Sequence, residues 1–437
     1  MKKIDIGLIG CGTVGSGVVK MLVENADIIS SRVGVPLNLK YVADTDKKKE
    51  DDNLLPKGVF TTDAMKVVED PDIDIILEMI GGEGIAKEII LKAIENKKQV
   101  VTANKALISA QGTKIFKAAF QKGVDIAFEA SVGGCMPVVK TLRETLVGNR
   151  IKGIIGILNG TCNYILSKIT DEGSDFESAL SGAQANGYAE ADPTLDVEGH
   201  DTAHKLTILN SLAYGMGLNL SDIYIEGISK ITPMDIQLAQ QFGYRIKLLA
   251  ISKSRGKQIE ARIHPTMIPF DNLLSNVNSS LNAVMISADA VSDIMLYGYG
   301  AGTMPTASAV ISDTVDLARN LLCGSPGRIP LPFSQSSGVM DMTIMPMEEI
   351  ETQYYFRFSI VDKPGVLSKI SGILGDNNIS LKSVQQKGKK TNGSVSLVML
   401  THLSREKDVK KSLAQIEKLD IVTDIPVLIR IEDENHK

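Results

Sequence analysis

The chain has few cysteines, and their arrangement suggests neither a disulfide framework nor a zinc site. Its 437 residues contain only Cys11, Cys135, Cys162 and Cys323, which lie far apart and form no CxxC pair. Such cysteines are typical of reduced thiols in a cytosol-like compartment. The chain also lacks any run near the roughly 18 apolar residues that cross a bilayer, and its N-terminus lacks the apolar stretch of a signal peptide. We therefore expect a soluble, cytoplasmic protein.

A strong charge imbalance is missing as well. The chain carries 47 basic and 52 acidic residues, for a net charge of −5, and its lysines are scattered. No basic patch suggests a groove for a phosphate backbone, so neither nucleic acid nor a membrane is an expected partner. Apolar residues make up 43% and charged residues 23%, the balance of an ordinary globular protein. The length predicts about two to four domains.

A strand, a glycine-rich turn and a helix are expected at the start of the chain. The run IDIGLIG leads directly into GCGTVGSGVVKMLVEN, where Gly10, Gly12 and Gly15 satisfy the pattern GxGxxG. In dinucleotide-binding turns the first glycine permits the tight turn, the second admits the pyrophosphate, and the third lets the helix pack closely. The amides of Thr13 and Val14 would then point at the phosphates. The pattern indicates a dinucleotide site, and a glycine-rich turn without a ligand is the alternative.

An acidic residue at the end of the next expected strand bears on the choice of dinucleotide. LNLKYVAD ends at Asp44, 29 residues after Gly15. An acid at this place binds the ribose hydroxyls of NAD, a role that Asp44 or Asp46 could fill. The lysines at 47–49 could instead accommodate the additional phosphate of NADP, or form a solvated turn. We expect NAD and leave NADP open.

Further strands and helices alternate along the first 130 residues. DIDIILEMIGG, GIAKEIILKAIENKK and QVVTANKALIS read as strand, helix and strand, apolar on both faces as a parallel doubly wound sheet requires. Ligands of such sheets bind beyond the carboxyl ends of the strands. Lys105 follows one of those ends, so we predict that it contacts the cofactor. The start of a helix is an unfavourable place for an ordinary surface cation.

A glycine turn after the sheet could hold a cation. In VDIAFEASVGGCMPVVKTL, Glu129 is expected to end a strand, and the backbone at 132–134 is free to turn its carbonyls inward. One carboxylate with several carbonyls gives oxygen-only coordination, which suits a hard cation. A tight hinge is the alternative.

The stretch GYAEADPTLDVEGHDTAHK, residues 187–205, is rich in acids and lies between two apolar segments. Asp201 and Lys205 are spaced i and i+4, so they share one helical face. On a surface this pair would contribute only about 0.3–0.5 kcal/mol. The apolar flanks suggest burial, where an idle ion pair is costly, and favour a function. His200 and His204 have the same spacing and could bind a metal, but ordinary hydrogen-bonded histidines are the favoured interpretation.

Several of these segments resemble one family. TANKAL, FEASVGG, GILNGTCNYIL and GYAEADPTLDVEGHDTAHKL occur in the order and spacing typical of homoserine dehydrogenases, and YGYGAGTMPTASAVISD is similar to the family's returning segment. The resemblance covers about residues 1–345. It implies an NAD(P)-dependent enzyme that interconverts L-aspartate 4-semialdehyde and L-homoserine in threonine, methionine and isoleucine biosynthesis.

The resemblance also implies roles for individual residues. Lys205 would be the general acid–base that protonates the carbonyl oxygen as hydride arrives, with Lys105 beside it to anchor substrate or shuttle the proton. Substrate binding would involve Glu190, Asp196 and Asp201, and carboxylates such as Glu190 and Asp201 would hold the substrate's ammonium group.

Cofactor and cation contacts follow from the same resemblance. Gly187 would contact the cofactor. A sodium or potassium ion would be held by Glu129 and the carbonyls of Val132, Gly134 and Met136. At 135–136 the sequence departs from the family, which commonly has a further glycine and an isoleucine there. Met136 is expected to adopt the required backbone angles less easily than glycine.

Two other functions remain as alternatives. Cys135 could be the nucleophile of a thiol-dependent semialdehyde dehydrogenase, but that chemistry needs a nearby base, usually histidine. The chain has only five histidines, so we expect Cys135 to be a small packed residue. A catalytically silent amino-acid sensor is the other alternative, which the retention of Lys105, Glu190, Asp201 and Lys205 disfavours.

The C-terminal segment reads as a regulatory module. Beyond an expected linker at 346–353, the order strand, helix, strand, strand, helix, strand predicts a ferredoxin-like βαββαβ domain. DKPGVLSKISGIL closely resembles ACT domains, which bind small amino acids. The resemblance implies L-threonine as an effector bound by Asp362, Gly365 and Asn378. A module that serves only assembly is the alternative.

The complete prediction is an α/β protein with three domains. A Rossmann-type doubly wound sheet is expected at 1–130, rejoined by about 305–345. A catalytic, substrate-binding and dimerisation domain with an open mixed sheet is expected at 131–304, and the ACT domain at 354–437. Such a central sheet could supply the interface of a homodimer or homotetramer.

Overall fold

The computed structural model describes residues 3–51, 55–332, 342–391 and 394–433. The chain divides into two compact units. The first unit comprises Met1–Gly160, Asp201–Ile223 and Ser280–Met342, and the second comprises Thr161–His200, Tyr224–Ser279 and Thr343–Lys437. The domain boundaries expected from the sequence stay predictions, and residues 333–341 of the expected rejoining segment lie outside the described residues.

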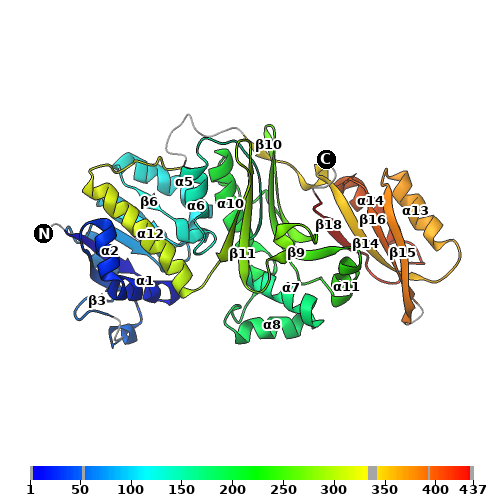
Figure 1. Cartoon of the computed structure of the whole chain (residues 1–437), viewed down its shortest axis with the longest axis horizontal. Coiled ribbons are helices and arrows are strands. Elements are labelled where there is room, and N and C mark those ends of the chain that lie inside the picture. The colour runs from blue at the N-terminus through cyan, green and yellow to red at the C-terminus, as the bar shows by residue number, and fades with distance from the viewer. Residues whose placement is uncertain (1–2, 52–54, 333–341, 392–393, 434–437) are drawn as a thin grey trace. The chain divides into compact units, whose positions relative to one another are not determined.

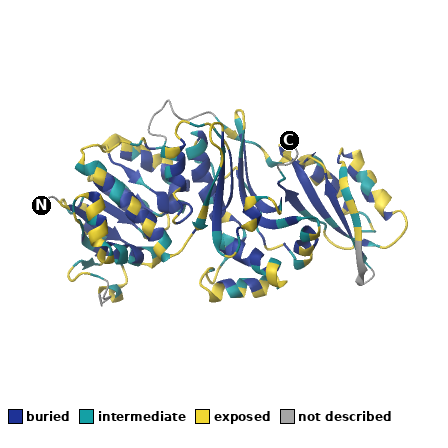
Figure 2. Cartoon of the chain, in the orientation of Figure 1, coloured by how far each residue is buried: buried dark blue, intermediate teal, exposed yellow. Residues whose placement is uncertain are grey.

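A six-stranded parallel sheet is the centre of the first unit (Figure 1). Its strand order is β3-β2-β1-β4-β5-β6, the doubly wound order of dinucleotide-binding folds. All residues of β1, β4 and β5 are buried, as expected for parallel strands covered on both faces (Figure 2). The strands are β1 (Ile4–Ile9), β2 (Leu37–Ala43), β3 (Phe60–Thr61), β4 (Ile75–Glu78), β5 (Gln99–Thr102) and β6 (Ile126–Ala127). The predicted Rossmann-type sheet is confirmed.

Helices cover this sheet. They are α1 (Thr13–Glu24), α2 (Ala26–Val33), α3 (Ala64–Glu69), α4 (Ile85–Glu95), α5 (Lys105–Lys122) and α12 (Thr303–Leu322). Two helices, α1 and α2, fill the long connection to β2. The late helix α12 lies along α1 (Figure 1). A side chain at Gly17 of α1 would collide with Thr303, because its Cβ would lie 2.9 Å from the threonine's Cγ2.

The first unit also contains an antiparallel three-stranded segment, in which β11 pairs with β7 and β12. Its elements are β7 (Ile151–Ile157), β11 (Leu281–Ala288) and β12 (Ser292–Tyr299), with the helices α6 (Val138–Lys140) and α10 (His200–Tyr214). Glu129 does not end a strand, because β6 stops at Ala127 and Glu129 begins a short 3₁₀ turn. α10 carries Asp201 and Lys205, and both are buried.

The second unit is built around a long hairpin, β9 (Tyr244–Arg255) and β10 (Gln258–Pro269). The other edge of β10 pairs in succession with β13 (Thr343–Ile344), β8 (Tyr224–Ile225) and β18 (Val427–Ile431), all parallel to it. The helices of this region are α7 (Gly160–Glu172), α8 (Phe176–Ala185), α9 (Thr194–Val197) and α11 (Pro233–Gln241). The predicted open mixed sheet is therefore confirmed.

The C-terminal module of the second unit has the predicted ferredoxin-like fold. Its strands lie in the order β18-β14-β16-β15, and two helices cover one face (Figure 1). The core includes Phe356, Ile370 and Val409, all fully buried. The elements are β14 (Glu351–Val361), α13 (Val366–Asp376), β15 (Leu381–Thr391), β16 (Ser394–Thr401), β17 (Ser404–Arg405) and α14 (Glu406–Ile416). β14 begins at Glu351, inside the segment 346–353 that was expected to be a linker, and the bounds of that linker stay a prediction.

Among the described residues, no helix is both long and apolar enough to cross a membrane.

Candidate active site

A buried glutamate organises the carboxyl ends of β4 and β5. Glu78 accepts a hydrogen bond from the Thr102 hydroxyl at 2.7 Å, and its other oxygen accepts two backbone amides of the turn after β4. Asn104 donates to the Gly82 carbonyl at 2.6 Å and so joins the two strand ends. Lys105 is the first residue of α5 immediately beyond them. Glu78 was not among the predicted site residues, although a single acid in an apolar strand was a usable signal.

Both predicted catalytic lysines contact one aspartate. The Nζ of Lys105 lies 3.0 Å from Oδ1 of Asp201, and the Nζ of Lys205 lies 2.7 Å from Oδ2. Asn159 donates its side-chain amide to Oδ2 of the same carboxylate at 2.9 Å. Lys205 also donates to the Leu158 carbonyl at 2.7 Å. We name Lys105, Asn159, Asp201 and Lys205 the lysine cluster.

The lysine cluster is largely shielded from water but accessible at one side. The side chains of Asp201 and Lys205 are each 9% exposed, whereas that of Lys105 is 41% exposed. Burial alone would raise the pKa of Asp201, but the ammonium groups of Lys205 and Lys105 outweigh it and hold this pKa well below its ordinary value. Asp201 is therefore a carboxylate at neutral pH. Two cations around one anion leave a net positive site that can stabilise a developing oxyanion.

Two features of the lysine cluster were not predicted. Asn159 lies in the segment GILNGTCNYIL, which was used only for the family resemblance, and its place just before α7 was the available signal. Asp201 was expected to bind the substrate's ammonium group, yet its carboxylate already accepts three donors from Lys105, Lys205 and Asn159.

The glycine turn has the steric features of a dinucleotide site. Gly10 has a φ of 96°, and a Cβ there would lie 2.7 Å from the Met79 carbonyl carbon. A Cβ at Gly15 would lie 2.0 Å from the Gly10 oxygen, so only glycine allows α1 to approach β1 this closely. A Cβ at Gly12 would meet no described atom within 4 Å, which leaves room for a phosphate. No described side chain caps the start of α1 at Thr13 and Val14.

Asp44 is held against this turn. Its Oδ2 accepts the backbone N–H of Cys11 at 2.6 Å, and its Oδ1 accepts the N–H of Asp46 at 2.9 Å. The carboxylate therefore lies at the carboxyl end of β2 beside the glycines, where a ribose would be recognised. Lys47 and Lys48 are exposed on a short 3₁₀ helix, Lys47–Asp51.

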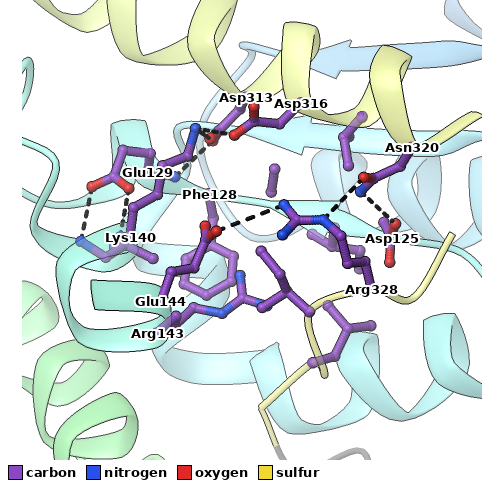
Figure 3. Close-up of a pocket in the computed structure, with 16 residues that line it drawn as sticks. Asp125, Phe128, Glu129, Lys140, Arg143, Glu144, Asp313, Asp316, Asn320 and Arg328 are labelled. Carbon is purple, nitrogen blue, oxygen red and sulfur yellow. Dashed lines mark hydrogen bonds and ion pairs between the residues drawn. The ribbon is translucent and has the colours of Figure 1, made fainter. Parts of the chain in front are cut away.

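The predicted cation ligand Glu129 is buried beneath α12 (Figure 3). Its carboxylate accepts the backbone amides of Val139 at 2.8 Å and Lys140 at 2.7 Å. Its own amide donates to Asp313, and the Lys140 ammonium lies 3.3 Å from that aspartate. Burial, together with the neighbouring Asp313 carboxylate, raises the pKa of Glu129 to about 7.

The remaining predicted cation ligands lie in the turn after Glu129. Gly133 and Gly134 both have a positive φ, whereas Met136, which the structure describes, does not. The expected backbone difficulty at Met136 is therefore wrong. Its carbonyl accepts the Val138 amide at 2.8 Å, and Val132 is fully buried.

Neither histidine of the HDTAH spacing has metal-site geometry. His204 shares a 2.7 Å hydrogen bond between its Nδ1 and the Ser109 hydroxyl, and His200 is exposed. Within the described ranges, no group of three or more His, Cys, Asp or Glu side chains could hold a metal ion.

The remaining substrate and cofactor candidates belong to the second unit. Gly187 has a φ of 72° and follows α8, and Glu190 is exposed in the loop beyond it. Asp196 lies in α9, and its carbonyl accepts the Cys162 thiol at 3.1 Å. The Thr161 hydroxyl donates to the Tyr188 carbonyl and attaches this loop to α7.

The effector candidates lie at the two ends of one helix. Asp362 and Gly365 are exposed before α13, and Asn378 follows that helix with a φ of 60°. Eleven residues of α-helix separate the ends by roughly 16 Å. These residues therefore do not meet within one chain.

The alternative nucleophile Cys135 is exposed, so the prediction that it is packed is wrong. Its thiol lies 3.4 Å from the Tyr299 carbonyl. Among the described residues, no histidine is hydrogen-bonded to it.

The glycine turn, the parallel sheet and a buried lysine beside an aspartate define a nicotinamide-dependent oxidoreductase. Family models agree: homoserine dehydrogenase matches residues 137–315, its NAD-binding domain matches 10–129, and the ACT domain matches 354–420. The chain belongs to the homoserine dehydrogenase family. It is thus an oxidoreductase that interconverts L-aspartate 4-semialdehyde and L-homoserine with NAD(P). The alternatives, a silent sensor and a Cys135-dependent enzyme, are not favoured.

Known homoserine dehydrogenases are similar along the whole chain. The enzyme from Neisseria gonorrhoeae is 45% identical over 432 residues, covering 99% of both chains. A crystal structure from Thiobacillus denitrificans has a TM-score of 0.93 at 45% identity, with 99% of both chains covered. A hyperthermophilic archaeal homoserine dehydrogenase in complex with NADPH has a TM-score of 0.62 at 26% identity, covering 72% of this chain and 98% of that one.

Proposed function

We propose that Lys205 is the general acid–base of the dehydrogenase reaction. The observation that carries this assignment is the contact of Lys105 and Lys205 with Asp201, at 3.0 and 2.7 Å. Bound nicotinamide supplies the hydride to the aldehyde carbon. The Lys205 ammonium gives one proton to the carbonyl oxygen and becomes an amine, and in the reverse direction it takes this proton back.

The other members of the lysine cluster position this group. Asp201 and the Leu158 carbonyl each accept a hydrogen bond from Lys205 at 2.7 Å, which fixes the direction of its remaining N–H. Lys105 is more exposed, so it is suited to binding the substrate and relaying the proton to solvent. Since Asp201 is engaged by lysines, we assign the substrate's ammonium group mainly to Glu190 and Asp196.

The preferred cofactor is proposed to be NAD. Asp44 lies beside the glycine turn, where its negative charge favours ribose hydroxyls and repels a 2′-phosphate. The first-turn amides of Thr13 and Val14, with Gly10, Gly12 and Gly15, would hold the pyrophosphate. Gly187 is proposed as a further cofactor contact. The archaeal relative binds NADPH, so an experiment must distinguish a preference for NAD from the use of both NAD and NADP.

A monovalent cation is proposed at Glu129 and the carbonyls of Val132, Gly134 and Met136. Each Glu129 oxygen accepts one amide and retains a second lone pair for an ion. Oxygen-only donors suit sodium or potassium.

Regulation by L-threonine through the ACT domain is proposed to involve two copies of the chain. Asp362 and Gly365 of one copy could share an effector with Asn378 of another, because α13 separates them within each chain. This arrangement requires a homodimer or a homotetramer. The four free cysteines fit the cytoplasm.

One assay tests the main assignment. Oxidation of NADH and NADPH is measured with aspartate 4-semialdehyde, with and without L-threonine, for the wild type and Lys205→Ala. We expect faster NADH turnover by the wild type and loss of turnover in Lys205→Ala. Undiminished turnover by the variant would disprove the role of Lys205, and equal or faster NADPH turnover would disprove the cofactor preference.

A further inference from the structure

A polar cavity lies within the second unit, and none of its lining residues belongs to the lysine cluster. It has a volume of about 490 Å³, in the range of small-molecule sites. Its walls come from Glu198–His200, the segment Tyr224–Lys230, the ACT helix α14 and strand β18. Its charged lining side chains are Glu198, Glu226, Glu406, Lys230, Lys410 and Arg430.

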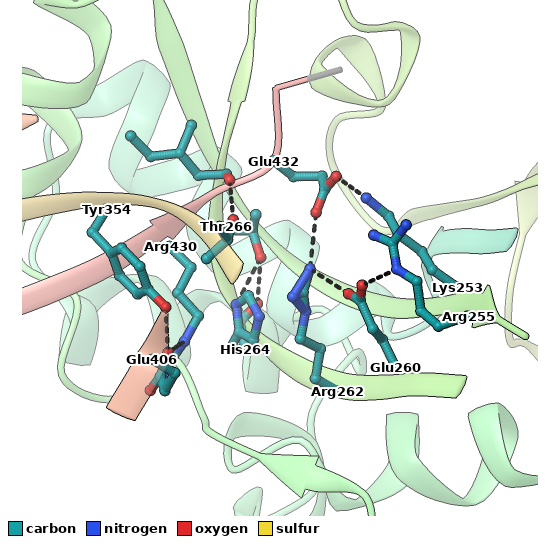
Figure 4. Close-up of polar contacts among 12 residues, drawn as sticks. Lys253, Arg255, Glu260, Arg262, His264, Thr266, Tyr354, Glu406, Arg430 and Glu432 are labelled. Atoms are coloured by element: carbon teal, nitrogen blue, oxygen red, sulfur yellow. Dashed lines mark hydrogen bonds and ion pairs between the residues drawn. The ribbon is translucent and has the colours of Figure 1, made fainter. Parts of the chain in front are cut away.

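A buried arginine, Arg430, lines this cavity, and its contact with Glu406 is drawn in Figure 4. The Arg430 side chain is 2% exposed and binds Glu406, which is fully buried, through Nε at 2.9 Å and through Nη2. Its Nη1 donates to Glu226 at 2.8 Å. Burial alone would lower the pKa of Arg430, but these carboxylates raise it, so the guanidinium remains charged.

The two carboxylates on Arg430 differ in how easily they can be replaced. Glu406 is inaccessible, whereas the Glu226 side chain is 30% exposed. A ligand carboxylate could take the place of Glu226 without leaving the buried guanidinium unpaired, which would be costly. Lys410, on α14, is 46% exposed and lies 5.7 Å from the Tyr224 ring centre, so it adds a positive charge at the cavity.

The balance of charges indicates the kind of ligand. Three acids and three bases line the cavity, so a phosphate would meet Glu198 and Glu226 as like charges. A dipolar molecule satisfies both signs, with its anionic end near Arg430 and Lys410 and its cationic end near Glu226. We propose that this cavity binds a free α-amino acid, as a regulatory site separate from the turn at Asp362.

The cavity wall is attached to the segment that precedes the catalytic helix. Ile228 donates its amide to the Val197 carbonyl at 2.9 Å, and Glu226 donates its amide to Ile263 at 2.8 Å. A Cβ at Gly227 would lie 2.4 Å from the Val197 oxygen and 2.6 Å from the Glu198 Cα. Because these backbones are in contact, a ligand that shifts the Glu226 backbone would also shift Val197–Glu198. Asp201 follows Glu198 by three residues, so the proposal connects such a shift with the start of α10.

This site rests on the proposed amino-acid regulation but not on the assignment of Lys205. The test is calorimetric titration of the full-length protein with L-threonine, L-isoleucine and L-methionine, followed by L-threoninol, which lacks the carboxylate. Variants are Lys410→Gln and Glu226→Gln at the cavity, Asp362→Asn at the other effector turn, and the control Lys411→Gln on the exposed side of α14.

We expect at least one of the three amino acids to bind, and each cavity variant to weaken its binding by roughly tenfold or more. Lys411→Gln should bind as the wild type does, Asp362→Asn should keep the binding that the cavity variants weaken, and L-threoninol should not bind at the cavity. Binding lost in Asp362→Asn but kept in Lys410→Gln would overturn the proposal, as would no binding of any of the three. Lys410 is exposed, so its variant should fold even if Glu226→Gln does not. Dehydrogenase activity, assayed in parallel, reports separately on the proposed catalytic role.

Discussion

Replacing Lys205 by methionine should separate catalysis from stability. Methionine retains most of the side-chain length but cannot donate the proton or bind Leu158 and Asp201, both 2.7 Å from the Lys205 nitrogen. Loss of a general acid typically lowers kcat by about 10²–10⁴-fold, which corresponds to roughly 3–5.5 kcal/mol of transition-state stabilisation. Since Lys105 would still bind the substrate, KM should change much less than kcat.

The cost to folding should be modest. In this variant Asp201 still accepts Lys105 at 3.0 Å and Asn159 at 2.9 Å. The loss should therefore lie below the about 3–5 kcal/mol typical of a buried charge deprived of its partner. The measurements are initial rates of NADH oxidation with aspartate 4-semialdehyde, and urea denaturation.

A matched control is available in the same unit. Lys98 is also buried, and its Nζ donates to the Ile73 carbonyl at 2.9 Å, but it lies outside the lysine cluster. Lys98→Met should lose stability and retain kcat. If Lys205→Met kept kcat within roughly threefold of the wild type while Lys105→Met lost it, the proton donor would be Lys105 and the proposed mechanism would be refuted.

Three further predictions concern the cofactor, the pH dependence of stability and the cation. Asp44→Ser should lower the ratio of kcat/KM for NADH over NADPH by roughly tenfold, whereas the control Asp46→Ser should not; an unchanged ratio in Asp44→Ser would remove Asp44 from cofactor selection. Burial lowers the pKa of Lys247 to about 7. Between pH 7 and 9 the unfolded chain therefore binds a proton at this lysine that the folded chain lacks. The free energy of unfolding should then rise by about 2 kcal/mol over this range. Denaturation of Lys247→Met should lack this rise, and an identical pH slope in both proteins would contradict the assignment. Glu129→Gln should abolish the dependence of the rate on sodium or potassium chloride, measured against choline chloride; a wild type indifferent to both salts would argue against the cation.

Local sequence patterns predicted the parts of the site that depend on short spacing. The contact between Asp201 and Lys205 follows from the four-residue spacing on a helix. The glycine turn follows from three glycines after an apolar strand. Lys105 could be assigned to the ligand side of the sheet because the carboxyl ends of parallel strands meet at one edge.

Contacts between distant segments could not be predicted in this way. Lys105 and Asp201 are 96 residues apart in the sequence, and no pattern indicates that one carboxylate pairs with both lysines. Arg430 and Glu226 are separated by 204 residues. Such pairs have no characteristic spacing in the sequence, because the distance between their side chains depends on how strands pair and helices pack. The exposure of Cys135 was mispredicted for the same reason, since it depends on the turn geometry beside Tyr299.

The strand that ends the ACT module has a practical consequence. β18 pairs with β10 at Thr266 and Met267, so the last strand of the regulatory module continues the sheet formed by the β9–β10 hairpin. Shortening the protein before this strand would leave backbone donors and acceptors of β10 without partners, and an open edge of this kind invites aggregation. Loss of activity in a truncated enzyme would then reflect insolubility and not relief or loss of control. Point substitutions in an intact chain are the appropriate way to study its regulation.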